Sequence, residues 1–324
     1  MQEAACVAPK LFVGQGFSMR TVYAFLAAAG FASSTPGAVL FSTSFESNQG
    51  FTTGSIQGQG APPFAVSGSF SIASTAGNAH TGSQYTRITN TGMSTIGSWA
   101  FVDTTRTASQ LATDGPIIRS TVWVNLSATG TIGTRTYSFG LEIYDEFAGH
   151  RMGRILMNHD GSITAMNGLS PGASFTTAPG VATRNAWHKL VHEADFSSHT
   201  LRFYFDGVAI ATPAGFNVFD VNATGFGDAD LFAIRGSSGT LTTADFRFDD
   251  LLIEQFRAPC PADLNADGVV DDADFVRFAE AYILLLCEDP EMPHDCPSDF
   301  NADMVVDDSD FQIFGQAYDA LVCQ

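Results

Sequence analysis

Two acidic segments of the sequence carry the residue types that bind calcium. The segment "DLNADGVVDDADF" at 263–275 returns 36 residues later as "DFNADMVVDDSDF" at 299–311. Calcium takes about six to eight oxygen ligands, and a tight loop of about twelve residues supplies them when carboxylates alternate along it. The first segment places oxygen at every ligand position of such a loop, through Asp263, Asn265, Asp267, the Val269 carbonyl, Asp271 and Asp274. We therefore predict one calcium ion in this loop.

The second segment offers the same ligands, through Asp299, Asn301, Asp303, the Val305 carbonyl, Asp307 and Asp310. It carries Met304 where the first loop has the turn glycine Gly268. A side chain at positive φ costs about 1 kcal/mol or more. We therefore predict that this second calcium site binds more weakly, or that it depends on the first loop for its shape. Because the carboxylates of each loop repel one another, we expect the ion to be needed for folding.

Four cysteines follow the spacing of the acidic repeat. Cys260 and Cys296 each precede the first aspartate of a loop by three residues, and Cys287 and Cys323 each follow 27 residues later. An even, repeat-symmetric set in an exported chain is typical of two disulfides, and the sequence alone leaves all the pairings open. If an antiparallel helix follows each loop, the end of one helix lies beside the start of the other loop. That arrangement favours Cys260–Cys323 and Cys287–Cys296.

The elements around the loops differ from the rest of the chain. Helical periodicity follows each loop, with apolar stripes at Phe275, Phe278, Ala279 and Tyr282 and at Phe311, Phe314, Gly315 and Tyr318. A proline-rich linker, "RAPCPAD", precedes them. From Ala258 onward there are 16 acidic residues against one arginine, whereas the preceding part has 18 against 14 basic residues. We predict that residues 257–324 form a separate small helical module with two calcium loops.

The doubled loops resemble the type I dockerin module, in which aspartate closes each loop and only a following helix is evident. With its cysteines, the segment is similar to the disulfide-containing, dockerin-like repeats at the C-termini of some bacterial exported proteins. The resemblance implies a tether to a cohesin-like or other surface receptor. It also implies recognition through the tenth and eleventh loop positions, here Asp272-Ala273 and Asp308-Ser309. An acidic residue at each tenth position departs from the common family pattern.

Residues 39–256 show the pattern of short strands separated by turns. In "STVWVNLS" (120–127), Val122, Val124 and Leu126 share one face and Trp123 lies on the other. In "TYSFGLEIYDEF" (136–147), Glu142 and Tyr144 lie opposite the apolar face formed by Phe139, Leu141 and Ile143. "HTLRFYFDGVAIA" (199–211) is a hairpin with its turn at Asp206-Gly207. Since no part of this region has a sustained helical period, we predict a mainly β, two-sheet sandwich of jelly-roll type.

This region is similar to concanavalin A-like and laminin-G-like jelly rolls, on "NAWHKLVHEADFSSHTLRFYFDGVAIA" (185–211), "DADLFAIRG" (228–236) and "FRFDDLLIE" (246–254). The resemblance implies binding of carbohydrate or protein, or cleavage of a polysaccharide, because the fold alone does not decide among them. It also implies a structural calcium ion between the first and last strands, held by Glu46 and Asp249. A surface salt bridge is the alternative role for these two carboxylates.

Retaining glycoside hydrolysis needs two carboxyls about 5 Å apart. Glu142 and Asp145 point to opposite faces of one strand. Glu142 and Glu146 share a face but lie about 13 Å apart. No pair on a single strand is therefore predicted. His188 and His192 also share a face, and we interpret them as solvent-facing rather than as a zinc pair.

A binding role needs aromatic side chains on an exposed sheet face, where they can stack on sugar rings. Trp123, Tyr144 and Tyr204 lie on the polar faces of their strands and are the predicted ligand-binding residues. The alternative is that they pack beneath a loop.

The N-terminal segment and the net charge indicate where the protein is found and which partners it does not favour. After Met19 and Arg20, "TVYAFLAAAGFA" has the length of a signal peptide and is too short to span a bilayer. We predict that residues 1–38 are an upstream extension and a signal peptide starting at Met19, and that the mature chain has no membrane span. A formal net charge of -19 disfavours nucleic acid and anionic membranes as partners.

The sequence therefore predicts a bacterial exported protein, secreted or on the cell surface. Its jelly-roll sandwich (39–256) would bind a glycan or an extracellular protein without catalysis, and its calcium module (257–324) would tether it. Two alternatives remain open. One is a polysaccharide-degrading enzyme, a glycoside hydrolase or a lyase, carried by the same tether. The other is a structural cell-surface protein.

Overall fold

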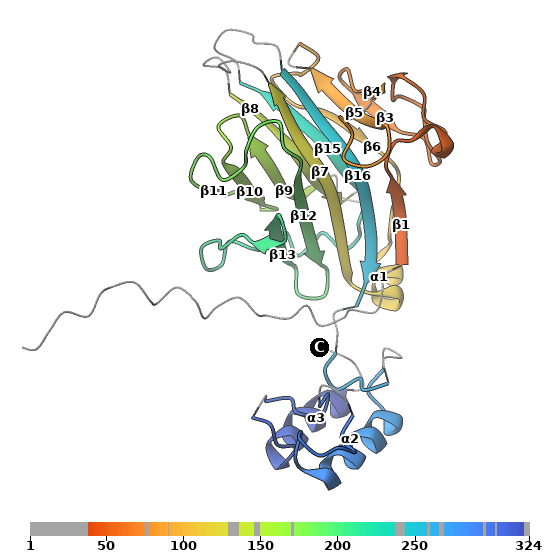
Figure 1. The fold of residues 1–324 in the computed structure, drawn as a ribbon, viewed down its shortest axis with the longest axis vertical. Helices are drawn as coiled ribbons and strands as arrows, with labels where there is room; N and C mark the ends of the chain where they lie inside the picture. The colour runs from red at the N-terminus through yellow and green to blue at the C-terminus, as the bar shows by residue number, and fades with distance from the viewer. Residues whose placement is uncertain are drawn as a thin grey trace, which may run out of the picture. The chain divides into compact units, whose positions relative to one another are not determined.

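The computed structural model describes residues 38–74, 78–89, 91–128, 136–145, 150–169, 172–236, 244–257, 260–265, 269–293, 296–301 and 303–320. The predicted signal segment lies outside these residues. Figure 1 shows two sheets lying in layers, and all the paired strands within them are antiparallel. The larger part of the chain is therefore a β-sandwich, as its alternating pattern predicts. Among the described residues, no helix has the length and apolar composition needed to cross a bilayer.

The first sheet has nine strands. In order across the sheet they are β14 (Val208–Ala209), β13 (Thr200–Phe205), β12 (His188–Asp195), β7 (Ile117–Ala128), β16 (Ala244–Phe256), β5 (Gln84–Thr89), β4 (Ser71–Ser74) and β2 (Gly54–Ser55), with β1 (Ala38–Thr43) also paired to β16. The ladder of β16 and β7 is interrupted by a bulge between Asp249 and Leu252, where Asp250 has φ 48. The bulge places Asp249 and Asp250 between the residues of β16 that pair with β5 and those that pair with β1.

The second sheet has seven strands. Their order is β11 (Ser174–Thr176), β10 (Ile163–Asn167), β9 (His150–Asn158), β8 (Tyr137–Asp145), β15 (Asp228–Arg235), β6 (Ser98–Phe101) and β3 (Ala65–Ser67). β8 lies between β9 and β15, so its residues from Ser138 to Tyr144 have cross-strand neighbours on both sides. Glu142 is paired with Arg154 on β9 and with Asp230 on β15.

One hydrophobic core fills the space between the sheets. Val122, Val124 and Leu126 of β7 and Phe139 and Leu141 of β8 are all fully buried in it. The alternation that we read from the sequence is therefore confirmed for both strands. Aromatic rings bridge the layers, since Phe139 lies 5.1 Å from Phe246 and 5.7 Å from Phe248 between ring centroids.

The predicted hairpin is also confirmed. β13 and β14 are joined by Asp206 and Gly207, whose φ values are 48 and 82. Positive φ at both central residues is the geometry of the type I′ turn, which matches the twist of the strands it joins.

A short helix, α1 (Ala108–Asp114), was not predicted from the sequence. Thr107 and Gln110 form a capping box at its N-terminus, and Leu111 is its one buried residue. Seven residues with a single buried side chain produce no helical periodicity, so the cap was its main sequence signal. A single 3-10 turn, η1 (Ser47–Gln49), follows β1.

Residues 260–320 contain a second hydrophobic cluster and two helices, α2 (Asp272–Leu284) and α3 (Asp308–Ala320). Each helix follows one acidic loop, as predicted. The predicted stripes are only partly correct. Phe278 and Phe314 are buried in the cluster, whereas Phe275 and Phe311 are 42% and 46% exposed. Val270 and Val306, the apolar residues of the two loops, are both fully buried in the same cluster.

Candidate functional site

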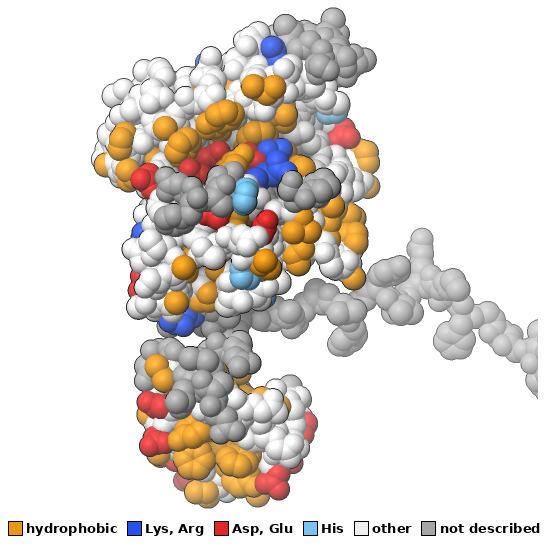
Figure 2. All heavy atoms as spheres, turned by 180° about the vertical axis from the view of Figure 1, so that it is seen from behind, with side chains coloured by type: hydrophobic (Ala, Val, Ile, Leu, Met, Phe, Trp, Pro, Cys, Tyr) orange, Lys and Arg blue, Asp and Glu red, His pale blue; other side chains and the backbone are white. Residues whose placement is uncertain are grey.

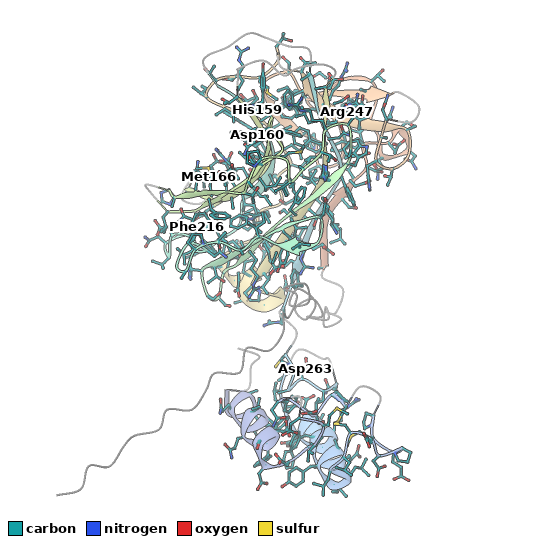
Figure 3. All side chains as sticks on the ribbon, turned by 60° about the vertical axis from the view of Figure 1, so that its left-hand side comes forward. His159, Asp160, Met166, Phe216, Arg247 and Asp263 are labelled. Carbon is teal, nitrogen blue, oxygen red and sulfur yellow. A yellow bond between two sulfur atoms is a disulfide. The ribbon has the colours of Figure 1, made fainter. Side chains whose placement is uncertain are left out.

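The first acidic loop is organised around Asp274, which is fully buried at the start of α2. Its carboxylate accepts hydrogen bonds from the backbone N–H of Asn265 (2.9 Å) and of Asp271 (3.0 Å). Asp271 caps the helix by accepting from the N–H of Ala273 (2.8 Å). One carboxylate thus ties the beginning of the loop to its end. Asp263 lies at the first position of the loop (Figure 3), and Asp267 lies outside the described residues.

The second loop repeats this arrangement. Asp310 is fully buried and accepts from the N–H groups of Phe300 (2.7 Å), Asn301 (3.1 Å) and Asp307 (3.0 Å). Asp299 accepts from the N–H groups of Asp303 (3.1 Å) and Met304 (2.9 Å). The equivalent hydrogen bonds give the two loops the same architecture, and their predicted ligands are all oxygen atoms, which suits a hard cation such as calcium.

Met304 adopts the left-handed conformation that its position in the loop predicts. Its φ is 73, and its side chain is exposed. The Val305 that follows forms a β-bridge with Leu286, beyond the end of α2. The strain at Met304 is therefore held in place partly by backbone pairing to the first repeat.

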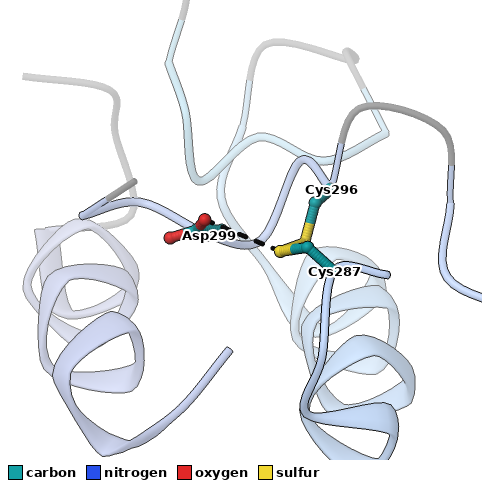
Figure 4. Close-up of side chains that lie close together, drawn as sticks. All are labelled: Cys287, Cys296 and Asp299. Carbon is teal, nitrogen blue, oxygen red and sulfur yellow. Dashed lines mark hydrogen bonds between the residues drawn. A yellow bond between two sulfur atoms is a disulfide. The ribbon is translucent and has the colours of Figure 1, made fainter. Parts of the chain in front are cut away.

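A disulfide joins Cys287 to Cys296, one of the two pairings that an antiparallel arrangement of the helices favours. Figure 4 shows it beside Asp299, with the Sγ of Cys287 3.6 Å from Oδ2 of that carboxylate. Cys287, Cys296 and Asp299 have the spacing of a metal site, but both sulfurs are consumed by the disulfide. Cys260 is disulfide-bonded as well, and Cys323 lies outside the described residues.

The tenth positions of the two loops take part in two equivalent hydrogen bonds between the repeats. Tyr282 on α2 donates its hydroxyl to Asp308 (2.5 Å) in the second repeat, and Tyr318 on α3 donates to Asp272 in the first. These hydrogen bonds raise the pKa of both tyrosines. Each tenth-position aspartate therefore has a tyrosine partner from the other repeat.

Glu46 and Asp249, the predicted cation ligands of the sandwich, both hold the backbone segment 80–84. Glu46 accepts from the N–H groups of Ser83 and Gln84 (2.7 Å each), and Asp249 accepts from that of His80 (2.8 Å). Neither takes part in a salt bridge among the described residues, which argues against the alternative role. The sandwich calcium ion stays a prediction.

The two carboxylates differ in their electrostatics. Burial acts to raise the pKa of Glu46, but hydrogen bonds from the backbone of Gln84 and Ser83 outweigh it and lower this pKa. Burial, with the charge of Asp250 next, raises the pKa of Asp249 to about 7.

The three aromatic residues predicted to bind a ligand do not form one platform. Trp123 and Tyr204 lie on the outer face of the nine-stranded sheet, and Tyr144 lies on the outer face of the seven-stranded sheet. Trp123 stacks on His80, with ring centroids 3.8 Å apart. It also lines a pocket of about 340 Å³ together with Lys189 and Asp250. Tyr144 belongs to a different and more highly charged group.

The interpretation of His188 and His192 as solvent-facing was wrong, because both are buried. The Nδ1 of His188 lies 2.8 Å from Asp206, and its Nε2 lies 3.0 Å from the backbone of Thr183. His192 packs against Phe203, with centroids 4.9 Å apart. Both histidines lie on the inward face of β12, together with Leu190 and Ala194 of the core between the sheets.

The charged group on the outer face of the seven-stranded sheet is centred on Glu142. This carboxylate is 1% exposed and accepts at Oε1 from Nε (3.1 Å) and Nη2 of Arg154. Nη1 of Arg151 lies 3.7 Å from the same oxygen. Figure 2 views this side of the sandwich and shows acidic and basic side chains gathered in a hollow of the surface.

Asp230 is the cross-strand neighbour of Glu142 and is 5% exposed. Burial, followed by the charges of Asp228 and Glu142, raises its pKa well above the usual value of an aspartate. Burial also raises the pKa of Glu142, against the opposing charges of Arg154 and Arg151. Tyr144 shares this environment, and burial, then the charges of Glu142 and Asp230, raises its pKa to about 12.

Apolar side chains complete the floor of this group. The guanidinium of Arg154 lies 4.0 Å from the centroid of the Phe232 ring, and its Nη1 lies 3.9 Å from the Sδ of Met166 on β10 (Figure 3). Trp99 on β6 is the cross-strand neighbour of Phe232. Glu142, Asp230, Tyr144, Arg151 and Arg154, which we call the Glu142 cluster, therefore sit beside aromatic surface.

Sequence reasoning named Glu142 and Tyr144 but missed Asp230, Arg151 and Arg154. The alternation of "DADLFAIRG" places Asp228 and Asp230 on one face of their strand. It does not say which strand lies beside them.

No family model matches the sequence, and no curated protein matches it. Among solved structures, the chain is similar to domain 4 of AbnA, a GH43 extracellular arabinanase from Geobacillus stearothermophilus, in complex with arabinotriose. That match has 14% identity and a TM-score of 0.40, and it covers 69% of this chain and 96% of the domain. The match to the cellulose induced protein Cip1 has 14% identity and a TM-score of 0.43, and it covers 68% of this chain and 99% of that chain.

The chain is also similar to part of a Trypanosoma rangeli sialidase. This match has 14% identity and a TM-score of 0.40, and it covers 67% of this chain and 30% of the sialidase. At these identities and TM-scores, the likenesses carry no conclusion about what this chain binds or does.

Proposed function

We propose that the protein is an exported carbohydrate-binding β-sandwich, which residues 257–324 attach to a surface receptor through a calcium-dependent, dockerin-like module. The observation that carries the binding proposal is the Glu142 cluster. Keeping several ionisable groups dry on the outer face of a sheet costs free energy, and here one carboxylate lies beside another carboxylate. Such groups with shifted pKa values gather at functional sites.

The chemistry of the Glu142 cluster suits a sugar. Carboxylates and guanidinium groups hydrogen-bond to hydroxyl groups, and the half-buried ring of Trp99 offers an apolar face on which a sugar ring can stack. Oδ1 of Asp230 and Nε of Arg151 are buried and have no hydrogen-bond partner among the described residues.

The substrate class that we propose is a neutral polysaccharide. The group contains Glu142, Asp228 and Asp230 against the two guanidinium groups of Arg151 and Arg154, and Glu142 already engages both. An anionic sugar would find no spare positive charge there.

The attachment proposal is supported by the two loops with equivalent carboxylate networks and by the helix that follows each of them. Calcium would be held by the predicted oxygen ligands of each loop and would neutralise their mutual repulsion. The receptor would be a cohesin-like protein or another surface component.

A glycan array with the full chain tests the binding proposal. Neutral polysaccharides should bind, and the binding should weaken at least tenfold in the double variant Tyr144→Phe, Arg151→Ala. Trp123→Ala, on the opposite sheet, is the matched control and should keep wild-type affinity. An array on which no glycan binds would favour the structural surface protein instead.

A further inference from the structure

Among the described residues of the sandwich, Glu142 and Glu193 are outward-facing glutamates that are nearly buried, and they differ in how their charges are matched. Glu193 on β12 lies in register between Arg202 on β13 and Arg119 on β7. Its Oε2 accepts from Nε (3.0 Å) and Nη2 (2.8 Å) of Arg119, and its Oε1 accepts from Nη1 of Arg202 (2.8 Å). Both carboxylate oxygens of Glu193 accept hydrogen bonds, and both of its cross-strand neighbours are arginines. This cluster therefore needs no ligand.

Glu142 is arranged differently. It has an arginine on one side, Arg154, but an aspartate on the other, Asp230. The guanidinium contacts all reach Oε1, so Oε2 lies outside them. Two carboxyls placed side by side away from water repel each other when both are ionised, and this repulsion destabilises the folded protein.

The strand register makes Glu142 and Asp230 direct cross-strand neighbours. Residues directly opposite each other in an antiparallel pair have Cβ atoms about 4.5–5.5 Å apart. Carboxyl groups on such neighbours are closer to the spacing of about 5–5.5 Å in retaining glycoside hydrolases than to the wider gap of inverting enzymes. The pair spans two strands, so a search along single strands passes over it.

We propose that Glu142 and Asp230 are the nucleophile and the general acid–base of a retaining glycoside hydrolase that acts on a neutral polysaccharide. This inference rests on the carbohydrate binding proposed above and adds a reaction to it.

The groups around Asp230 and Glu142 indicate which carboxyl is the general acid–base and which is the nucleophile. Burial, then the charges of Asp228 and Glu142 and a hydrogen bond with Asp228, raises the pKa of Asp230 and favours its protonated form. Burial also raises the pKa of Glu142, but the charges of Arg154 and Arg151 oppose this shift. We therefore assign the proton donor to Asp230 and the nucleophile to Glu142, which holds the arginine contacts. Tyr144 hydrogen-bonds to Glu142 and would position its carboxylate.

The reaction balances with water as the only co-reactant. In the first step the glycosidic C–O bond breaks, Asp230 gives its proton to the departing oxygen, and a carboxylate oxygen of Glu142 bonds to the anomeric carbon. In the second step Asp230 takes a proton from water, the water oxygen bonds to the anomeric carbon, and the ester bond to Glu142 breaks. The products are a shortened polysaccharide and a new reducing end of unchanged anomeric configuration.

The experiment measures binding and cleavage separately on the full chain. The probes are soluble mixed-linkage glucan, xylan, arabinan and galactan, with alginate as an anionic control. Affinity electrophoresis reports binding, a reducing-end assay reports cleavage, and proton NMR of fresh products reports the anomer. The variants are Glu142→Gln and Asp230→Asn, with Glu193→Gln as the matched buried control.

We expect the wild type to cleave the neutral polysaccharide that it binds. Glu142→Gln and Asp230→Asn should lose at least about a hundredfold in cleavage rate and keep their affinity within about threefold. Glu193→Gln should lower the melting temperature and keep its cleavage rate. Formate should restore cleavage in Glu142→Ala, because it replaces the missing carboxylate, and a structural role would not produce this rescue.

Several outcomes overturn the inference. Binding without new reducing ends would overturn the hydrolase and leave the proposed binding function intact. Products of inverted anomeric configuration would assign a different reaction to the site. Unsaturated products, which absorb in the ultraviolet, would do the same. Cleavage that survives in both carboxyl variants would remove Glu142 and Asp230 from it. Absence of binding to every probe would overturn both proposals.

Discussion

At the scale of single residues, His192 shows how burial sets a pH response. The side chain is fully buried, and burial lowers its pKa to about 3, from an ordinary value of 6.5. Between these two values the unfolded chain binds a proton that the folded chain does not. The contribution of His192 to stability is therefore complete above pH 6.5 and is lost progressively as the pH falls toward 3.

Replacing His192 by leucine should remove this loss. Wild-type stability should fall by roughly 1.4 kcal/mol per pH unit below pH 6.5 through this group, and the variant should fall by less. At pH 7 the variant should be as stable as the wild type or more so, because both ring nitrogens lack partners among the described residues. Urea unfolding between pH 7 and 4 measures this. His150→Asn, at an exposed position, is the control, and equal pH slopes in wild type and His192→Leu would contradict the assignment.

Met304 offers a second test at one residue. Its φ of 73 costs a side chain about 1 kcal/mol or more. Met304→Gly should therefore tighten calcium binding in the second loop by roughly fivefold. Met304→Ala keeps the Cβ atom and should show no such gain. Calorimetric titration in an Asp274→Ala background isolates the second loop. Equal gains in the two variants would show that the methionine side chain, and not its backbone, weakens the site.

At the scale of elements, the sequence predicted the strands, the Asp206-Gly207 hairpin and the two helices after the acidic loops. These features depend on alternation, turn residues and local spacing, all of which are read from neighbouring positions. Strand order and register are not local. The facing of Glu142 and Asp230 joins residues 88 positions apart in the chain, and no periodicity encodes it. The burial of His188 and His192 was missed because their face of β12 was assigned to solvent, although it also carries Leu190 and Ala194 of the core.

The disulfide acts on a whole loop. Cys296 lies three residues before Asp299, and its bond to Cys287 fixes where the second loop begins. The double variant Cys287→Ser, Cys296→Ser should weaken calcium binding in the second loop by at least about tenfold, because the unfolded loop gains freedom. The first loop, measured in an Asp310→Ala background, should change less. A uniform loss in both loops would show that the disulfide stabilises the module as a whole.

At the scale of the whole molecule, charge is concentrated in the C-terminal residues, which carry 16 acidic side chains from Ala258 onward. A cation that binds only the folded loops stabilises them by mass action. The sandwich has its own core and does not depend on those loops. We therefore expect the two parts to respond differently to a chelator.

Removal of calcium should unfold residues 257–324 and leave the sandwich folded. Differential scanning calorimetry should show two transitions with calcium, and a chelator should move the one that carries the helical circular dichroism signal. An unchanged helical signal after chelation would remove calcium from the proposal. A shift of the sandwich transition that Glu46→Gln abolishes would place a further ion beside Glu46 and Asp249.

The exchange of hydroxyl groups between Tyr282 and Asp308, and between Tyr318 and Asp272, also bears on how such a module can arise. Each repeat contains a donor tyrosine and an acceptor aspartate. Each of these residues bonds to the other repeat and not to its own. A lone ancestral repeat would thus have been complementary to a second copy of itself. Duplication within one chain then turns a pairing between two molecules into a fold that no dilution can separate.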